Sequence, residues 1–100
     1  MIYRHGDVIL QSIEKLPKSG QITTQVCLAE GEATGHHHML TCEDGIDVVL
    51  EAKEILFKIE SPGTLTHQEH DLITIDPGIY RVSREQEFDH FARTAKRVVD

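Results

Sequence analysis

Short apolar runs rich in β-branched residues alternate along the chain with closely spaced glycines and prolines. The runs occupy residues 7–13, 22–29, 46–50, 55–60, 72–75 and 79–82. Ile55, Phe57 and Ile59 alternate with Lys58 and Glu60, so their strand should bury one face. Many short strands with frequent turn signals favour an antiparallel sandwich or a small barrel. We therefore predict an all-β, mostly antiparallel fold.

Two turn signals predict particular backbone geometries. Asp44 and Gly45 lie between two strand-like segments, which is typical of a tight hairpin with glycine at positive φ. Asp76, Pro77 and Gly78 fit a type II turn, in which proline takes the second position and glycine the third. We expect a hairpin at the first site and a type II turn at the second.

The last sixteen residues have a different pattern, because their apolar positions recur at helical spacing. Ser83 and Gln86 are spaced as a capping box before this segment. We predict a short C-terminal helix over one end of the sheet, and an extended arm that docks on a second subunit is the alternative. No linker or repeat divides the chain, so residues 1–100 should form a single domain.

The composition of the chain argues against some classes of binding partner. The net charge of −7 argues against nucleic acid and anionic membranes, which bind basic patches. The first residues contain no signal peptide or membrane span, so we expect a cytoplasmic protein. Cys27 and Cys42 should be reduced thiols, and Cys42 fits a core position better than a soft ligand or a nucleophile. Serine-hydrolase and phosphate-loop motifs do not occur.

Five of the seven histidines fall in two clusters, at residues 36–38 and 67–70. Imidazole is the commonest metal ligand in proteins. On a strand, His36 and His38 share a face and present two nitrogen donors, whereas His37 points the other way. Such a pair needs one or two further ligands to form a metal centre.

The second cluster offers the remaining ligands. On an uninterrupted strand His67 and Glu69 would point inward and His70 outward, whereas a turn within 68–71 would bring His70 inward instead. We therefore expect His67 or His70 to join the first pair. Three histidines and a carboxylate suit Zn²⁺, Fe²⁺, Mn²⁺, Ni²⁺ or Cu²⁺.

A different interpretation assigns no ligand to these residues. The clusters would then be surface histidines, with Glu69 and Asp71 as ion-pair partners, and the isolated His5 and His90 would have no ligand role either. The protein would be a non-enzymatic acidic interaction or assembly module, whose association responds to histidine protonation.

Residues 31–38 place Gly31 before His36 and His38, and Glu43 follows. This segment resembles the first metal-binding motif of the cupin superfamily, which implies a small β-barrel with both histidines and Glu43 as metal ligands. The turn at 76–78 is similar only loosely to the second cupin motif, whose histidine follows the turn. The chain is also similar to short uncharacterised cupin-like proteins of bacteria and phages.

The histidine-rich chain is therefore predicted to be a small cupin-like barrel with a divalent-metal site. The candidate ligands are His36, His38, His67, His70 and Glu43. Glu69 is the candidate general base, and the metal would act as a Lewis acid or activate water toward a small polar substrate. Exposed strand edges lead us to expect a homodimer.

Overall fold

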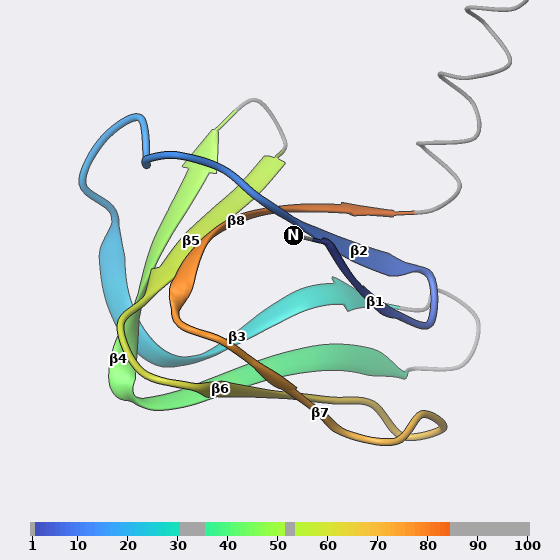
Figure 1. Ribbon diagram of the computed structural model, residues 1–100. Helices are drawn as coiled ribbons and strands as arrows, with labels where there is room; N and C mark the ends of the chain where they lie inside the picture. The colour runs from blue at the N-terminus through green and yellow to red at the C-terminus, as the bar shows by residue number, and fades with distance from the viewer. Residues whose placement is uncertain (1, 31–35, 52–53, 85–100) are drawn as a thin grey trace, which may run out of the picture.

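The computed structural model describes residues 2–30, 36–51 and 54–84, and their strands form one antiparallel sheet that curls into a nearly closed barrel (Figure 1). The strands are β1 (Ile2–His5), β2 (Val8–Ser12), β3 (Gln21–Glu30), β4 (His37–Glu51), β5 (Glu54–Ile59), β6 (Gly63–Thr66), β7 (Ile73–Ile75) and β8 (Gly78–Arg84). The predicted all-β antiparallel class is confirmed. The predicted C-terminal helix or arm lies outside the described residues.

Most strands coincide with the predicted apolar runs, but β1, β6 and the first half of β4 do not. The sheet order is β1-β2-β8-β5-β4-β6-β7. The long β4 organises this sheet, because β3 pairs along one of its edges and β5 and then β6 pair along the other.

The predicted hairpin at residues 44–45 is wrong, because β4 runs through them without a break. Gly45 has a φ of 107°, and the pairing with β3 shifts register nearby, between Thr23 and Gln25. An irregular step of this kind bends a strand and increases its twist. The positive φ of Gly45, which we expected in a hairpin, therefore occurs at a bend within a continuous strand.

The predicted type II turn is also wrong. Among the described glycines only Gly6 and Gly45 have positive φ, so Gly78 lacks the backbone conformation that this turn requires. Gly78 instead pairs with Ile59 at the start of β8, and a Cβ atom there would lie 3.2 Å from the Tyr80 hydroxyl. Glycine at this position leaves room for the tyrosine ring.

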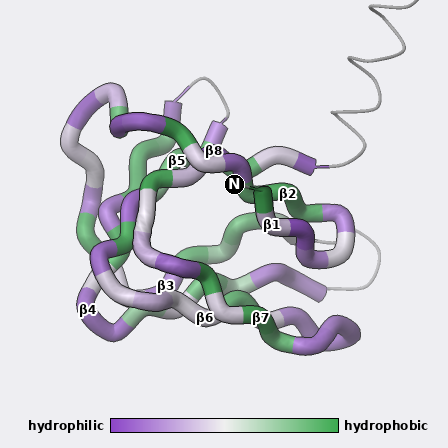
Figure 2. Tube along the Cα trace, viewed as in Figure 1, coloured by the Kyte–Doolittle hydropathy of each residue, from purple (hydrophilic) through white to green (hydrophobic). Residues whose placement is uncertain are grey.

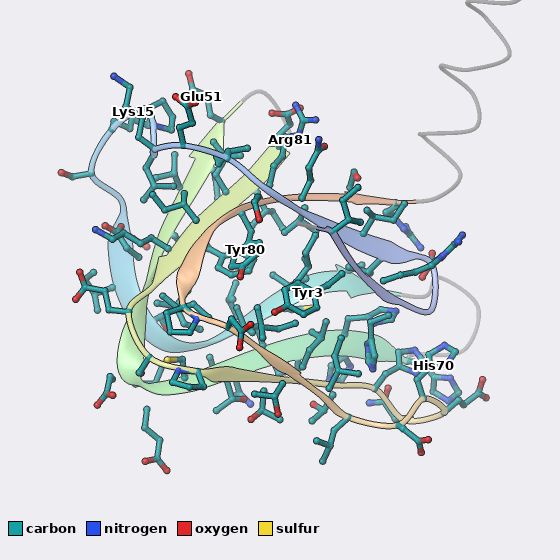
Figure 3. The ribbon with its side chains drawn as sticks, in the orientation of Figure 1. Tyr3, Lys15, Glu51, His70, Tyr80 and Arg81 are labelled. Carbon is teal, nitrogen blue, oxygen red and sulfur yellow. The ribbon has the colours of Figure 1, made fainter. Side chains whose placement is uncertain are left out.

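The barrel interior is filled by aliphatic side chains around two aromatic rings. Phe57 and Tyr80 are the largest fully buried residues, and Cys42 belongs to the same core. Apolar residues are concentrated on the strands, whereas the connection between β6 and β7 is hydrophilic (Figure 2). Figure 3 shows Tyr3 and Tyr80 inside the barrel, where their rings meet edge to face at a centroid distance of 5.9 Å.

The barrel is not closed by a strand ladder where β1 comes near β7 and the residues around it. We call this boundary, between β1 and residues 71–76, the seam. The Tyr3 hydroxyl accepts a hydrogen bond from the Asp76 amide across it at 3.1 Å. His5 Nε2 donates to the Asp71 carbonyl at 2.8 Å. Two side chains of β1 thus hold the seam, and the second of them leads into the histidine site.

Candidate histidine site

Five histidine rings converge at one end of the barrel, and we call them the histidine cluster. His5 ends β1, His36 directly precedes β4, and His38 is the second residue of β4. His67 and His70 lie between β6 and β7. Their ring centroids are 4.4–6.4 Å apart in seven contacting pairs. His70 marks this end of the barrel in Figure 3.

Both histidines of the second sequence cluster reach His38. The ring of His67 lies 4.4 Å from that of His38, and the ring of His70 lies 6.0 Å from it. We expected one of them to join His38, and both rings lie beside it because residues 67–72 do not form a strand. Without the strand alternation, side chains three residues apart can face the same neighbour.

His38 occupies the centre of the cluster and is only 4% exposed. Its Nδ1 lies 3.0 Å from His5 Nδ1, and its Nε2 lies 3.3 Å from Asp7 Oδ1. Burial, together with the charges of His67 and His5, lowers the pKa of His38 to about 4. The ring is therefore neutral at neutral pH.

Asp7 is the second residue of the tight turn between β1 and β2. Its Oδ2 accepts hydrogen bonds from Arg84 Nη2 at 3.0 Å and Nε at 3.3 Å. Burial opposes ionisation of Asp7, but the hydrogen bond and charge of Arg84 outweigh it and lower the pKa of the carboxyl group. The guanidinium thus holds an ionised carboxylate whose other oxygen faces His38.

Gly6 makes this approach possible. Its φ of +62° suits glycine, and a Cβ atom there would lie 2.6 Å from His70 Nε2 and 3.1 Å from His38 Cε1. The turn between β1 and β2 is therefore in direct contact with two rings of the cluster.

The outer part of the cluster is more exposed. His67 Nδ1 accepts a hydrogen bond from the Glu69 amide at 3.0 Å, and burial with the neighbouring His70 and His36 lowers the pKa of His67. His36 Nδ1 lies 3.4 Å from Glu69 Oε1. The Gln68 side chain accepts from the backbone amide of His37 and ties this segment to β4.

The structure brings most of the predicted residues together, but not all of them. The assembled ones are His36, His38, His67, His70 and Glu69. Glu43 is exposed five residues beyond His38 on β4, about 17 Å away at about 3.3 Å per residue. It borders a shallow pocket with Cys42 and Ser61 instead.

Sequence reasoning missed three residues of the site: His5, Asp7 and Arg84. His5 was interpreted as having no ligand role, yet it is 4% exposed and bonded to His38. Its two-residue spacing from Tyr3 was the available signal, since both side chains take the same face of a strand. His90 lies outside the described residues.

Within the described segments, no three His, Cys, Asp or Glu side chains already stand in a geometry that would hold a metal ion. Two donor atoms, His38 Nε2 and Asp7 Oδ1, do lie 3.3 Å apart, and the ring of His70 lies next to that of His38.

Residues 4–85 match the family model described as a domain of unknown function, DUF8820, and the chain belongs to this family. The match includes every residue of the site described above. No curated protein and no solved structure matches the chain significantly. In the described segments no helix is long and apolar enough to cross a membrane.

Proposed function

We propose that this protein binds a divalent transition-metal ion in the histidine cluster, through His38, Asp7 and His70. The observation that carries the proposal is the distance of 3.3 Å between His38 Nε2 and Asp7 Oδ1. A neutral imidazole can face a carboxylate at this distance in two ways, by donating an N–H to it or by sharing a metal ion with it.

The spacing and charge of this pair fit a shared metal ion. The pKa of His38 is lowered to about 4, so its ring is neutral at neutral pH and one of its two nitrogens has the lone pair that a metal ligand needs. Two ligands about 2.0–2.1 Å from a tetrahedral metal stand about 3.3–3.4 Å apart. The measured separation of 3.3 Å matches that spacing.

His70 supports the proposal as the third ligand. Its Nε2 adjoins Gly6, and among the described residues its ring contacts other histidines without a hydrogen bond. His67 is committed to the Glu69 amide, and breaking that bond would free its Nδ1 as a fourth donor. A set of nitrogen and oxygen donors without thiolate suits Zn²⁺, Fe²⁺, Mn²⁺ or Ni²⁺.

Three ligands and an open position would also permit catalysis on a small polar substrate. A bound metal would supply Lewis acidity or an activated water there. In this extension of the proposal Glu69 serves as the general base, since its carboxylate lies at the exposed rim of the cluster beside His36.

The test is thermal unfolding and isothermal titration calorimetry of tag-free, chelator-treated protein with each of these four metals. Metal at about a hundredfold excess over Kd adds about 2.7 kcal/mol, which raises Tm by several degrees. His38→Ala and Asp7→Asn should lose this shift. His37→Ala, which changes the neighbouring histidine on the opposite face of β4, should keep it.

A wild-type protein that shows neither a Tm shift nor binding heat with any of the metals contradicts the proposal. If stability or association then changes with pH alone, the acidic module with pH-responsive histidines becomes the better account.

A further inference from the structure

We infer that the outer edge of β3, the edge that faces away from β4, pairs with the same edge of a second copy of this chain in an antiparallel ladder. This pairing generates a dimer with a two-fold axis. The inference goes beyond the proposed function, because it rests on backbone pairing and involves no metal ion.

β3 is the longest strand that has a neighbour on one side only. In the described part of the chain, β1, β3 and β7 each belong to a single ladder. β1 and β7 are four and three residues long, and the seam brings them near each other. β3 is ten residues long and lies along β4, and no other described strand pairs with it (Figure 1). Its outer edge is therefore available to a further strand.

The backbone of Gln25 directs its hydrogen-bonding groups toward this outer edge. Its partner on β4 is Thr41, whose carbonyl faces Gly63 on β6. Gln25 and Thr41 therefore form a non-hydrogen-bonded pair, in which the amide and carbonyl of each residue point away from the other strand. The Thr23 hydroxyl donates to the Gln25 carbonyl at 3.1 Å and accepts from the Gln25 amide at 3.4 Å.

The hydroxyl of Thr23 is a poorer partner for these groups than a strand. The amide contact of 3.4 Å is longer than the separation of about 2.7–3.2 Å that is typical of N–H···O hydrogen bonds. One hydroxyl also serves two backbone groups, which a paired strand satisfies with two separate hydrogen bonds. A second strand thus improves the hydrogen bonding of this edge.

The composition of β3 permits a close approach by another copy. Residues 21–29 contain no charged residue and no proline, although the chain has a net charge of −7. Charged side chains, prolines and short length are features that keep edge strands from pairing. In an antiparallel self-pairing, residues 21–29 of the two copies lie opposite each other, so no like charges face across the ladder. Two copies of an acidic chain can therefore meet along this edge.

A second copy is the occupant that this edge fits by itself. A two-fold axis near Val26 presents the same donors and acceptors from both sides, so each hydrogen bond of the ladder occurs twice. The pairing of β3 with β4 shifts register on either side of residues 25–27, which bends the strand. These three residues pair regularly with β4 and form the centre of the inferred ladder.

The test is sedimentation equilibrium of tag-free protein in EDTA at neutral pH, over a range of concentrations. Wild type should form a reversible dimer. Gln25→Pro removes an amide that the β4 ladder does not use, which is the position where an edge strand tolerates proline. The dimer should be about 10- to 100-fold weaker, since the symmetry removes the bond twice. Gln25→Ala keeps the amide and should keep the dimer.

A second pair of variants tests the competition by Thr23. Thr23→Val removes the hydroxyl that contacts the Gln25 backbone, so it should tighten the dimer by about 3- to 10-fold. Thr24→Val is the matched control, because it makes the same change at the neighbouring residue without removing that contact. Its dissociation constant should equal that of the wild type.

Hydrogen exchange of the Gln25 amide is a readout that requires no variant, because pairing should slow it as the protein concentration rises. A wild type that stays monomeric up to about 1 mM overturns the inference, whether or not another protein pairs with β3. A dimer that folded Gln25→Pro forms as tightly as the wild type overturns it as well. So does a dimer in which exchange of the Gln25 amide is independent of concentration, even if Gln25→Pro fails to fold.

Discussion

Tyr3 and His5 are two residues apart on β1, and both cross the seam, but they build chemically different contacts. Tyr3 accepts a backbone hydrogen bond and packs edge to face on Tyr80, whose pKa is raised to about 12, chiefly by burial and then by Tyr3. The Tyr80 ring thus stays neutral near neutral pH. His5 contacts His38, whose partners include an ionised carboxylate. One strand thus combines a contact to a buried phenol with a contact to a histidine whose protonation changes with pH.

The largest loss of stability should come from removing the buried ring of Tyr80. Tyr80→Ala removes a fully buried ring, and we expect the free energy of unfolding to fall by about 3–5 kcal/mol. Denaturant unfolding measures it. Ile22→Ala, at a side chain that is 71% exposed, should cost less than about 0.5 kcal/mol. Similar losses for both variants would contradict the difference in packing.

The stability that His38 contributes should depend on pH. The pKa of His38 falls from 6.5 to about 4 on folding, so the unfolded chain binds more protons between these values. Stability from this residue is complete above pH 6.5 and is lost as pH falls toward 4, by about 3 kcal/mol in all. Denaturant unfolding with EDTA across this range measures the loss.

Two variants sharpen that measurement. His38→Gln should reduce the pH dependence to the part that His67 contributes, since the pKa of His67 is also lowered, whereas Tyr3→Phe should keep all of it. The contribution of Asp7, whose pKa is lowered from 3.8, disappears only below that value and so falls outside this window. If the stability of His38→Gln falls with pH as steeply as that of the wild type, other groups cause the pH dependence.

Two glycines have positive φ, and we expect their replacement to lower stability by an intermediate amount. Gly6→Ala and Gly45→Ala both impose a strained backbone, with an expected loss of about 1–2 kcal/mol each. Only the Cβ at residue 6 would contact His70 and His38, whereas the one at residue 45 would meet Ile22. Calorimetry should therefore show weaker metal binding for the first variant alone. Equal metal affinities in the two variants would mean that the turn at Gly6 does not contribute to the metal site.

The smallest effect is expected for Tyr3→Phe. It removes the hydroxyl that accepts from the Asp76 amide but keeps the ring against Tyr80, so the loss should be about 1 kcal/mol. Thermal unfolding at neutral pH measures it. A loss as large as that of Tyr80→Ala would mean that the hydroxyl, and not the ring, holds this part of the seam.

Local periodicity predicted much of the fold. The alternation of Ile55, Phe57 and Ile59 identified β5, and the number of short strands indicated the all-β class. The corner at Gly45 was missed because an Asp-Gly pair favours positive φ in a hairpin and in a bent strand alike. The pairing partners decide between them, and those lie elsewhere in the chain.

The site was less accessible to the sequence for the same reason. His36 and His38 were found because two neighbours on one strand suffice to suggest a pair of ligands. The bonds of His5 to His38 and to Asp71 join residues 33 and 66 positions apart, and Asp7 and Arg84 are separated by 77. No short pattern encodes such contacts, which arise only when the sheet curls into a barrel.

The seam has a further consequence for local opening. Strand ladders protect amide protons from exchange with water, whereas the seam has two side-chain bonds in place of a ladder. The lowest-energy opening of this barrel should therefore separate β1 from residues 71–76, and amides there should exchange earlier than those of β4 and β5. A metal ion held by Asp7 on one side and His70 on the other would bridge that opening and slow the exchange.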